Sequence, residues 1–158
     1  MKGFGEEEKA RKKKLKKTTS QNQNLINLAI NLHSQGKIKE ASKYYKYCIK
    51  QGFNDPKVFS NYGTILHSEG KLIEAELSTR KAIKLNTKFA DAYCNLGNIL
   101  NDLGKLKEAE VSYRKGIKLN PDFTNAHFNL GNILKNQGRF KEAEVSYRKA
   151  AELKPNFI

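Results

Sequence analysis

The chain has 158 residues, of which 38% are hydrophobic and 29% are charged, and its 30 lysines and arginines outnumber 16 acidic residues. This apolar content lies below the roughly 45–50% of an ordinary globular domain, which argues against one large central core and favours thin stacked layers. No apolar run is long enough for a membrane span or a secretory signal, so we predict a cytoplasmic protein. Cys48 and Cys94 lack the spacing of a disulfide scaffold or of a zinc site.

The first 21 residues are predicted to form a basic, mostly disordered tail (1–21). They carry eight lysines and arginines against three glutamates, a net charge of +5, and such runs rarely fold. The tail is either a binder of nucleic acid or of an anionic lipid surface, or a solvating extension. No nucleic-acid-binding motif accompanies the charge, and composition does not decide between these two roles.

Residues 22–157 divide into four blocks of 34 residues with no insertion, namely 22–55, 56–89, 90–123 and 124–157. Each block has glycine at its fifteenth place, glutamate at its nineteenth and alanine at its twentieth. The fifteenth-place glycines are Gly36, Gly70, Gly104 and Gly138. Matching at a fixed period is the signature of a repeat protein, in which each repeat packs only on its neighbours.

Each block predicts two helices. In block 90–123, Tyr93, Leu96 and Leu100 recur at helical spacing, which indicates a first helix over the second to fourteenth places. The glycine supplies the turn, and a second helix begins near Lys105 and ends at about Leu119. Glutamates that precede arginines by four residues support the second helices. These pairs are Glu76–Arg80, Glu110–Arg114 and Glu144–Arg148. The predicted fold is all-α.

The residues at these places resemble the tetratricopeptide repeat family over all four blocks. In the last block the matching residues are His127, Leu130, Gly131, Leu134, Ala143, Tyr147, Ala150 and Pro155. Departures from the family pattern elsewhere are Ala29, Thr79, Thr87 and Gly116. Glycine inside a helix is expected to cost about 0.5–1 kcal/mol relative to alanine. The resemblance implies a right-handed α-solenoid of four helix-turn-helix repeats, whose first helices line a concave groove that holds extended peptides.

The sixth place of every block is asparagine. The four residues are Asn27, Asn61, Asn95 and Asn129. Asparagine is a mediocre helix former, and its amide both donates and accepts hydrogen bonds, so it can pair with a peptide backbone of any sequence. The arrangement resembles the asparagine ladder of the repeats of O-linked N-acetylglucosamine transferase. We predict that it binds a peptide; the alternative is that the amides bond water or neighbouring repeats.

Other first-helix residues are weaker candidates for the same groove. The further predicted peptide-binding residues are Asn98, Asn132, Asn101, Asp102 and Asn136. His33 and His67 share the twelfth place, but two imidazoles without a third ligand make a poor metal site, so we predict polar groove lining and no metal. Cys94 is expected to face the groove, whereas Cys48 is expected to be buried.

The last block has no capping helix after it within the sequence. Relatives usually cover the final apolar face with a polar helix, so we expect Tyr147, Ala150, Leu153 and Phe157 to lie uncovered. Two explanations compete: the natural protein continues beyond Ile158, or two copies associate through this face to form a homo-oligomer.

No nucleophile–base pair, phosphate-binding loop or pair of catalytic carboxylates is present, so we predict a non-catalytic scaffold without a cofactor. Its partner is an extended segment of another protein. The alternatives are a recruitment module of a larger transferase, and a binder of nucleic acid or anionic lipid through the tail.

Overall fold

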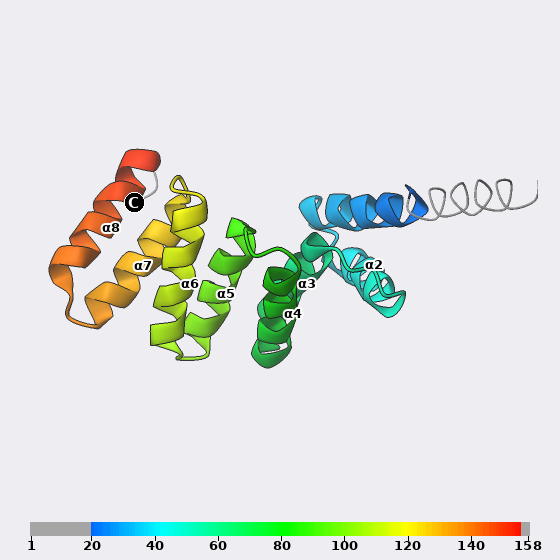
Figure 1. Cartoon of the computed structure of the whole chain (residues 1–158), viewed down its shortest axis with the longest axis horizontal. Helices are drawn as coiled ribbons and strands as arrows, with labels where there is room; N and C mark the ends of the chain where they lie inside the picture. The colour runs from blue at the N-terminus through cyan, green and yellow to red at the C-terminus, as the bar shows by residue number, and fades with distance from the viewer. Residues whose placement is uncertain (1–19, 156–158) are drawn as a thin grey trace, which may run out of the picture. The chain divides into compact units, whose positions relative to one another are not determined.

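The computed structural model describes residues 20–155, and the regular secondary structure of this part of the chain is entirely helical (Figure 1). The all-α prediction is therefore confirmed. The chain divides into two compact units, Met1–Asn54 and Asp55–Ile158, which we describe separately. The predicted tail falls almost wholly outside the described residues, as does Phe157; Ser20 and Gln21, which were assigned to the tail, are helical.

Unit 1 contains one helix pair. Its first helix is described over residues 20–34, and α2 covers Ile38–Lys50. The buried apolar side chains of the pair are Ile26, Ala29, Leu32, Ala41, Tyr45 and Cys48. His33 lies with its ring edge-on to Tyr45, with ring centroids 6.0 Å apart, and partial burial lowers the pKa of this imidazole.

Unit 2 contains three helix pairs that succeed one another along the chain (Figure 1). The first helices are α3 (Pro56–Ser68), α5 (Ala90–Asp102) and α7 (Thr124–Asn136). The second helices are α4 (Leu72–Leu85), α6 (Leu106–Leu119) and α8 (Phe140–Leu153). Each helix packs on the next in order, and the starts of corresponding helices recur every 34 residues. The bounds of α5 and α6 agree with the sequence-based prediction to within about one residue.

The fifteenth-place glycine ends each first helix, as predicted. At Gly104 the backbone φ is +73°, a left-handed conformation that glycine adopts without the steric cost of a Cβ atom. The amide of Gly104 donates to the carbonyl of Asn101 at 2.9 Å, and that of Lys105 donates to Leu100 at 2.8 Å. These two bonds form a Schellman motif, which satisfies carbonyls that the helix end would leave unpaired.

Within the last two pairs, a glycine on the first helix faces a tyrosine on the second. A Cβ atom at Gly97 would lie 2.6 Å from the ring of Tyr113, and one at Gly131 would lie 2.7 Å from the ring of Tyr147. Side chains at these glycines would push the helices apart, because real Cβ contacts are not this short. The Tyr113 ring is 2% exposed and belongs to the core cluster shared by α5, α6, α7 and α8.

The pair α3–α4 departs from this arrangement at Thr79, which stands where the other pairs have tyrosine. Thr79 is completely buried against Gly63. Its hydroxyl has no hydrogen-bond partner among the residues that the structure describes. A buried polar atom without a partner destabilises the folded state, since it has given up its bonds to water.

Thr79→Val should therefore raise the free energy of unfolding by about 1 kcal/mol, because it removes that hydroxyl and keeps a branched side chain. Urea denaturation followed by circular dichroism measures the change. Thr64→Val is the matched control, since the Thr64 hydroxyl donates to the carbonyl of Ser60 at 3.1 Å and accepts from Asn95 at 3.3 Å. The control should lose stability. A Thr79→Val protein that unfolds at the same or lower urea concentration would contradict this account.

Gly116, the glycine inside α6, makes room for a neighbour. A Cβ atom there would lie 2.5 Å from Cys94 Sγ on α5. The helix-propensity cost that the sequence predicted is thus offset by packing, because a smaller residue at one position allows a larger one at the other.

The stabilities of these two positions should be coupled. The change in the free energy of unfolding caused by Gly116→Ala should be about 1 kcal/mol more favourable in a Cys94→Ala background than in the wild-type protein. Only in the wild-type background does the new methyl group meet the sulfur of Cys94. The measurement is a double-mutant cycle of urea unfolding over the four proteins. An equal effect of Gly116→Ala in both backgrounds would show that the contact does not constrain α6.

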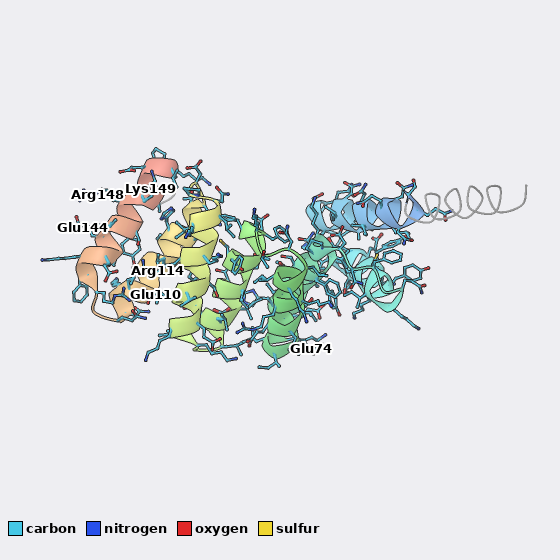
Figure 2. All side chains as sticks on the ribbon, viewed as in Figure 1. Glu74, Glu110, Arg114, Glu144, Arg148 and Lys149 are labelled. Carbon is cyan, nitrogen blue, oxygen red and sulfur yellow. The ribbon has the colours of Figure 1, made fainter. Side chains whose placement is uncertain are left out.

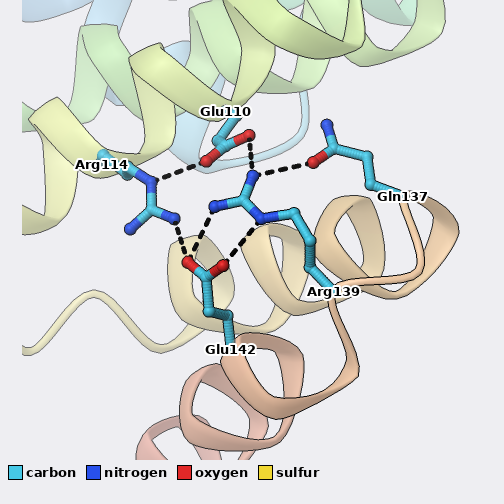
Figure 3. A network of polar contacts seen from close by, with 5 residues as sticks. All are labelled: Glu110, Arg114, Gln137, Arg139 and Glu142. Carbon is cyan, nitrogen blue, oxygen red and sulfur yellow. Dashed lines mark hydrogen bonds and ion pairs between the residues drawn. The ribbon is translucent and has the colours of Figure 1, made fainter.

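The three predicted glutamate–arginine pairs all form on the second helices. Their separations are 2.9 Å for Glu76–Arg80, 2.8 Å for Glu110–Arg114 and 2.7 Å for Glu144–Arg148. The first two pairs also reach the following repeat, and Figure 3 shows the network around Glu110, which joins α6 to Arg139 and to α8. The sequence predicted the pairs within each helix, but not the bonds between repeats.

Candidate functional site

The candidate site is a polar cavity of about 310 Å³ within unit 2. Its residues come from α3, α5 and α7, with one side chain from α6. The lining residues are His67, Asn98, Asn101, Asp102, Tyr113, Asn129 and Asn132. Five of these seven were predicted as peptide-binding residues. Their convergence follows from the 34-residue period, which places equivalent residues of successive first helices side by side.

Asn98 is the centre of the hydrogen bonding in this cavity. Its Oδ1 accepts from the hydroxyl of Tyr113 at 2.7 Å and from Nδ2 of Asn129 at 2.9 Å. Burial raises the pKa of Tyr113, so this phenol remains a donor at neutral pH. The Nδ2 of Asn98 and the Oδ1 of Asn129 have no partner among the described residues, which leaves the cavity one donor and one acceptor for a ligand.

The tyrosine–asparagine hydrogen bond recurs one repeat later, where the hydroxyl of Tyr147 donates to Oδ1 of Asn132 at 2.8 Å. Tyr113 lines this cavity, and the sequence analysis did not single it out as a site residue. The signal was present in the spacing, because an asparagine fifteen residues before the tyrosine occurs in both of the last two blocks.

One carboxylate gives the cavity its charge. Asp102 accepts from Nε2 of His67 at 2.7 Å across the α3–α5 boundary, and from Asn101 at 3.3 Å. Its side chain is 50% exposed, so solvent and ligands reach it. The cavity lining contains no lysine or arginine, and its electrostatics therefore favour donor-rich or cationic groups.

The four ladder asparagines do not share one environment. The Nδ2 of Asn95 donates to the hydroxyls of Ser60 and Thr64, at 3.2 and 3.3 Å, and Asn129 donates to Asn98. These amides bond the preceding repeat, as the alternative interpretation of the sequence held, and keep their oxygens for other partners. Asn27 lies in unit 1, where it accepts from Gln23 at 3.1 Å.

Two predicted groove residues stand apart from the cavity. Asn61 is half-buried on α3, and Asn136 is exposed at the end of α7; neither lines the cavity. The histidines His33 and His67 belong to different units. Among residues 20–155, no group of three or more potential metal ligands occurs, and no helix is long and apolar enough to cross a bilayer.

Cys94 differs from its expected position. It is 5% exposed and packs against Gly116 instead of facing the groove. Burial, with a smaller contribution from Asp91, raises the pKa of its thiol to about 12. The sequence placed the residue on the first helix correctly, but the glycine opposite it draws the side chain into the core. Cys48 is fully buried, as predicted.

Both thiols should accordingly resist modification in the folded protein. A thiol with a pKa near 12 is ionised about a thousandfold less at about pH 8 than one with its ordinary value, and the thiolate is the reactive form. Ellman's reagent should therefore react with neither cysteine until urea unfolds the chain, when both should react at the rate of a small thiol. Rapid reaction of a thiol in the native protein would contradict the burial of the cysteine that reacts, which a Cys48→Ala variant identifies.

The predicted self-association residues are not equally accessible. Ala150 is fully buried, contrary to expectation, because it belongs to the packed side of α8. Tyr147 is half-buried and packs on Phe128 with ring centroids 5.7 Å apart, and Leu153 is half-buried. The strongly exposed apolar side chains of α8 are Phe140 and Val145, at 67% and 68%.

The chain is similar to known repeat proteins in sequence and in structure. Models of the tetratricopeptide repeat match residues 79–111 and 124–157, and a model described as TPR repeat matches 97–138. No protein with curated annotation matches the sequence.

Solved structures extend the similarity over most of the chain. The crystal structure of MamA is 26% identical, with a TM-score of 0.76, over 93% of this chain and 86% of that one. That of YrrB, described as a TPR protein with an unusual peptide-binding site, is 24% identical, with a TM-score of 0.72, over 84% and 69%. That of a thermophilic TPR protein from Thermus thermophilus is 19% identical, with a TM-score of 0.72, over 85% and 75%. The last two show a shared fold alone.

Proposed function

The chain belongs to the tetratricopeptide repeat family, and on this premise we propose that its polar cavity binds an extended segment of another protein. Proteins of this family are typically non-catalytic scaffolds for protein–protein interaction, and they bind peptide segments of their partners. The observation that carries the proposal is the convergence of five predicted groove residues on one cavity between α3, α5 and α7.

The cavity has the chemistry that a peptide backbone requires. An extended peptide presents a carbonyl and an amide at every residue, and these groups need an acceptor and a donor when water is excluded. Asn98 Nδ2 supplies a donor and Asn129 Oδ1 supplies an acceptor, and neither has a partner among the described residues. The Tyr113 and Asn98 side chains hold each other in place before a ligand arrives, which reduces the entropy cost of binding.

The length of the bound segment follows from the helices that contribute. Neighbouring helices pack about 8–10 Å apart, so the step from α3 to α7 spans roughly 16–20 Å. A strand rises about 3.3 Å per residue, and unit 2 therefore holds about five or six residues of a peptide.

Asp102 supplies side-chain selectivity. Its carboxylate is the single acidic group of the lining and is half exposed, so a lysine or arginine of the peptide gains a charge-assisted hydrogen bond there. An acidic side chain at the same position meets repulsion. The partner segment is therefore expected to carry a basic residue and few acidic ones.

A random peptide library displayed on phage tests this function with the full chain as bait. Peptides that bind should compete with one another, and the double substitution Asn98→Ala with Asn132→Ala should weaken their affinity by about tenfold to a hundredfold, at about 0.5–1.5 kcal/mol per lost hydrogen bond. Fluorescence polarisation of labelled peptides measures the change, and thermal melts check that the variant is folded.

Two comparisons make this result specific. Gln35→Ala is the control, because that exposed amide follows the first helix of unit 1, donates to Asn31 and does not line the cavity. This variant should bind the peptides as tightly as the wild-type protein does. Asp102→Asn should weaken basic peptides and spare neutral ones. Selected peptides that bind the double variant as tightly as the wild-type chain would exclude the cavity as their site.

A further inference from the structure

The ion pairs on the second helices of unit 2 follow a fixed spacing. Glu76 on α4 accepts from Arg80 at 2.9 Å and from Lys105, the residue before α6, at 2.8 Å. Arg80 in turn contacts Glu108, in the first turn of α6, at 2.7 Å. A glutamate–arginine pair on one second helix is thus met by a basic residue and a glutamate, three positions apart, in the next repeat.

The next junction repeats these contacts with equivalent residues. Glu110 accepts from Arg114 and from Arg139, both at 2.8 Å, and Arg114 contacts Glu142 at 3.0 Å (Figure 3). The glutamate at the centre of each junction is largely covered: the side chain of Glu76 is 11% exposed and that of Glu110 is 15% exposed. The hydrogen bond from Lys105, followed by that from Arg80, lowers the pKa of Glu76 against the effect of desolvation.

The corresponding pair on α8 has only half of its contacts. Glu144 and Arg148 pair with each other at 2.7 Å, but their side chains are 67% and 70% exposed. Among the described residues, no second basic side chain bonds Glu144, and no second glutamate bonds Arg148. Figure 2 labels both residues on α8, the last helix of unit 2.

Unit 1 carries the complementary half of this arrangement. Lys37 precedes α2, and Glu40 lies in its first turn, at the block places that Lys105 and Glu108 hold before and within α6. Both side chains are exposed, and neither forms an ion pair within the described part of the chain.

The same face of unit 1, judged by the block places of its residues, has a partly apolar hollow. This cavity of about 640 Å³ has apolar walls, of which Leu28 and Tyr47 are 39% and 48% exposed, and a rim of amides. Its lining residues are Leu25, Leu28, Tyr47, Phe53, Gln21, Asn22, Asn24 and Gln51. In unit 2 the equivalent surface also has a wall from the preceding second helix, since Ile83 of α4 lines the corresponding cavity with Leu96.

We propose that α8 of one molecule docks on this face of unit 1 of a second copy of the chain. Lys37 of the second copy then binds Glu144, and its Glu40 binds Arg148, which reproduces the contacts of the two internal junctions. The outer side of α8 then covers the hollow of unit 1, in the way that α4 forms a wall of the equivalent cavity beside Leu96. Ala151 of α8 stands at the block place that Ile83 holds in α4.

Charge complementarity and register select a second copy as the occupant. Both halves of the junction occur in one chain, at block places that match those of the internal junctions. The two surfaces differ from each other, so the contact is heterologous and copies add head to tail instead of closing as a symmetric pair. The proposal is independent of peptide binding, because none of its residues lines the polar cavity.

A charge-swap experiment on the full chain tests the docking. Sedimentation velocity over a concentration series should show self-association of the wild-type protein that weakens with added salt. Arg148→Glu and Glu40→Arg should each weaken association by about tenfold or more, because each places like charges together at the contact. Thermal melts confirm that both variants are folded, and Lys107→Glu, at an exposed residue of α6 outside the contact, is the control that should associate normally.

Mixing the two variants gives the decisive result. In a mixture, α8 of the Arg148→Glu variant meets unit 1 of the Glu40→Arg variant with opposite charges, and the remaining contact is wild type, so association should return to nearly its wild-type strength. Loss of association in Arg148→Glu without recovery on mixing would overturn the head-to-tail arrangement in favour of a symmetric pair through α8. A wild-type chain that stays monomeric throughout, or association that neither variant changes, would overturn the docking itself.

Discussion

Contact between a glycine on the first helix and a tyrosine ring on the second packs each of the last two helix pairs, and in the first of these pairs the tyrosine also lines the polar cavity. The missing side chain at Gly97 lets the Tyr113 ring cross between the helices. The hydroxyl of the same ring donates to Oδ1 of Asn98 and so holds that amide in the polar cavity. Core packing and groove chemistry therefore share one side chain, and neither can change without the other.

The two sides of unit 2 use polar groups in different ways. In the polar cavity, amides and a phenol bond one another across helices beside the His67–Asp102 contact, and Asn98 Nδ2 and Asn129 Oδ1 keep no partner among the described residues. On the second helices, charged side chains pair in a chain of shared partners, as where Glu110 serves both Arg114 and Arg139. Such shared contacts are worth more than isolated surface pairs, because each ion is already held by another.

Much of this architecture could be predicted from the sequence, because helix pairs depend on local spacing of apolar residues and on a glycine at each turn. The directions of polar side chains could not be predicted, because they depend on which side chains the helix of the neighbouring repeat places next to them. Asn95 bonds its neighbours because α3 offers the hydroxyls of Ser60 and Thr64. Cys94 turned inward for a similar reason, as Gly116 leaves a space for it.

The spacing of the ion pairs also bears on how such a chain changes in length. Each joint is closed by one bond that spans 28 residues and another that spans 29, as in Arg80–Glu108 and Lys105–Glu76. Removal of residues 90–123 as a block brings Arg80 opposite Glu142 and Arg139 opposite Glu76, so the new joint has the same chemistry as the old ones. A whole repeat can therefore be removed or duplicated without loss of the ion pairs that close each joint.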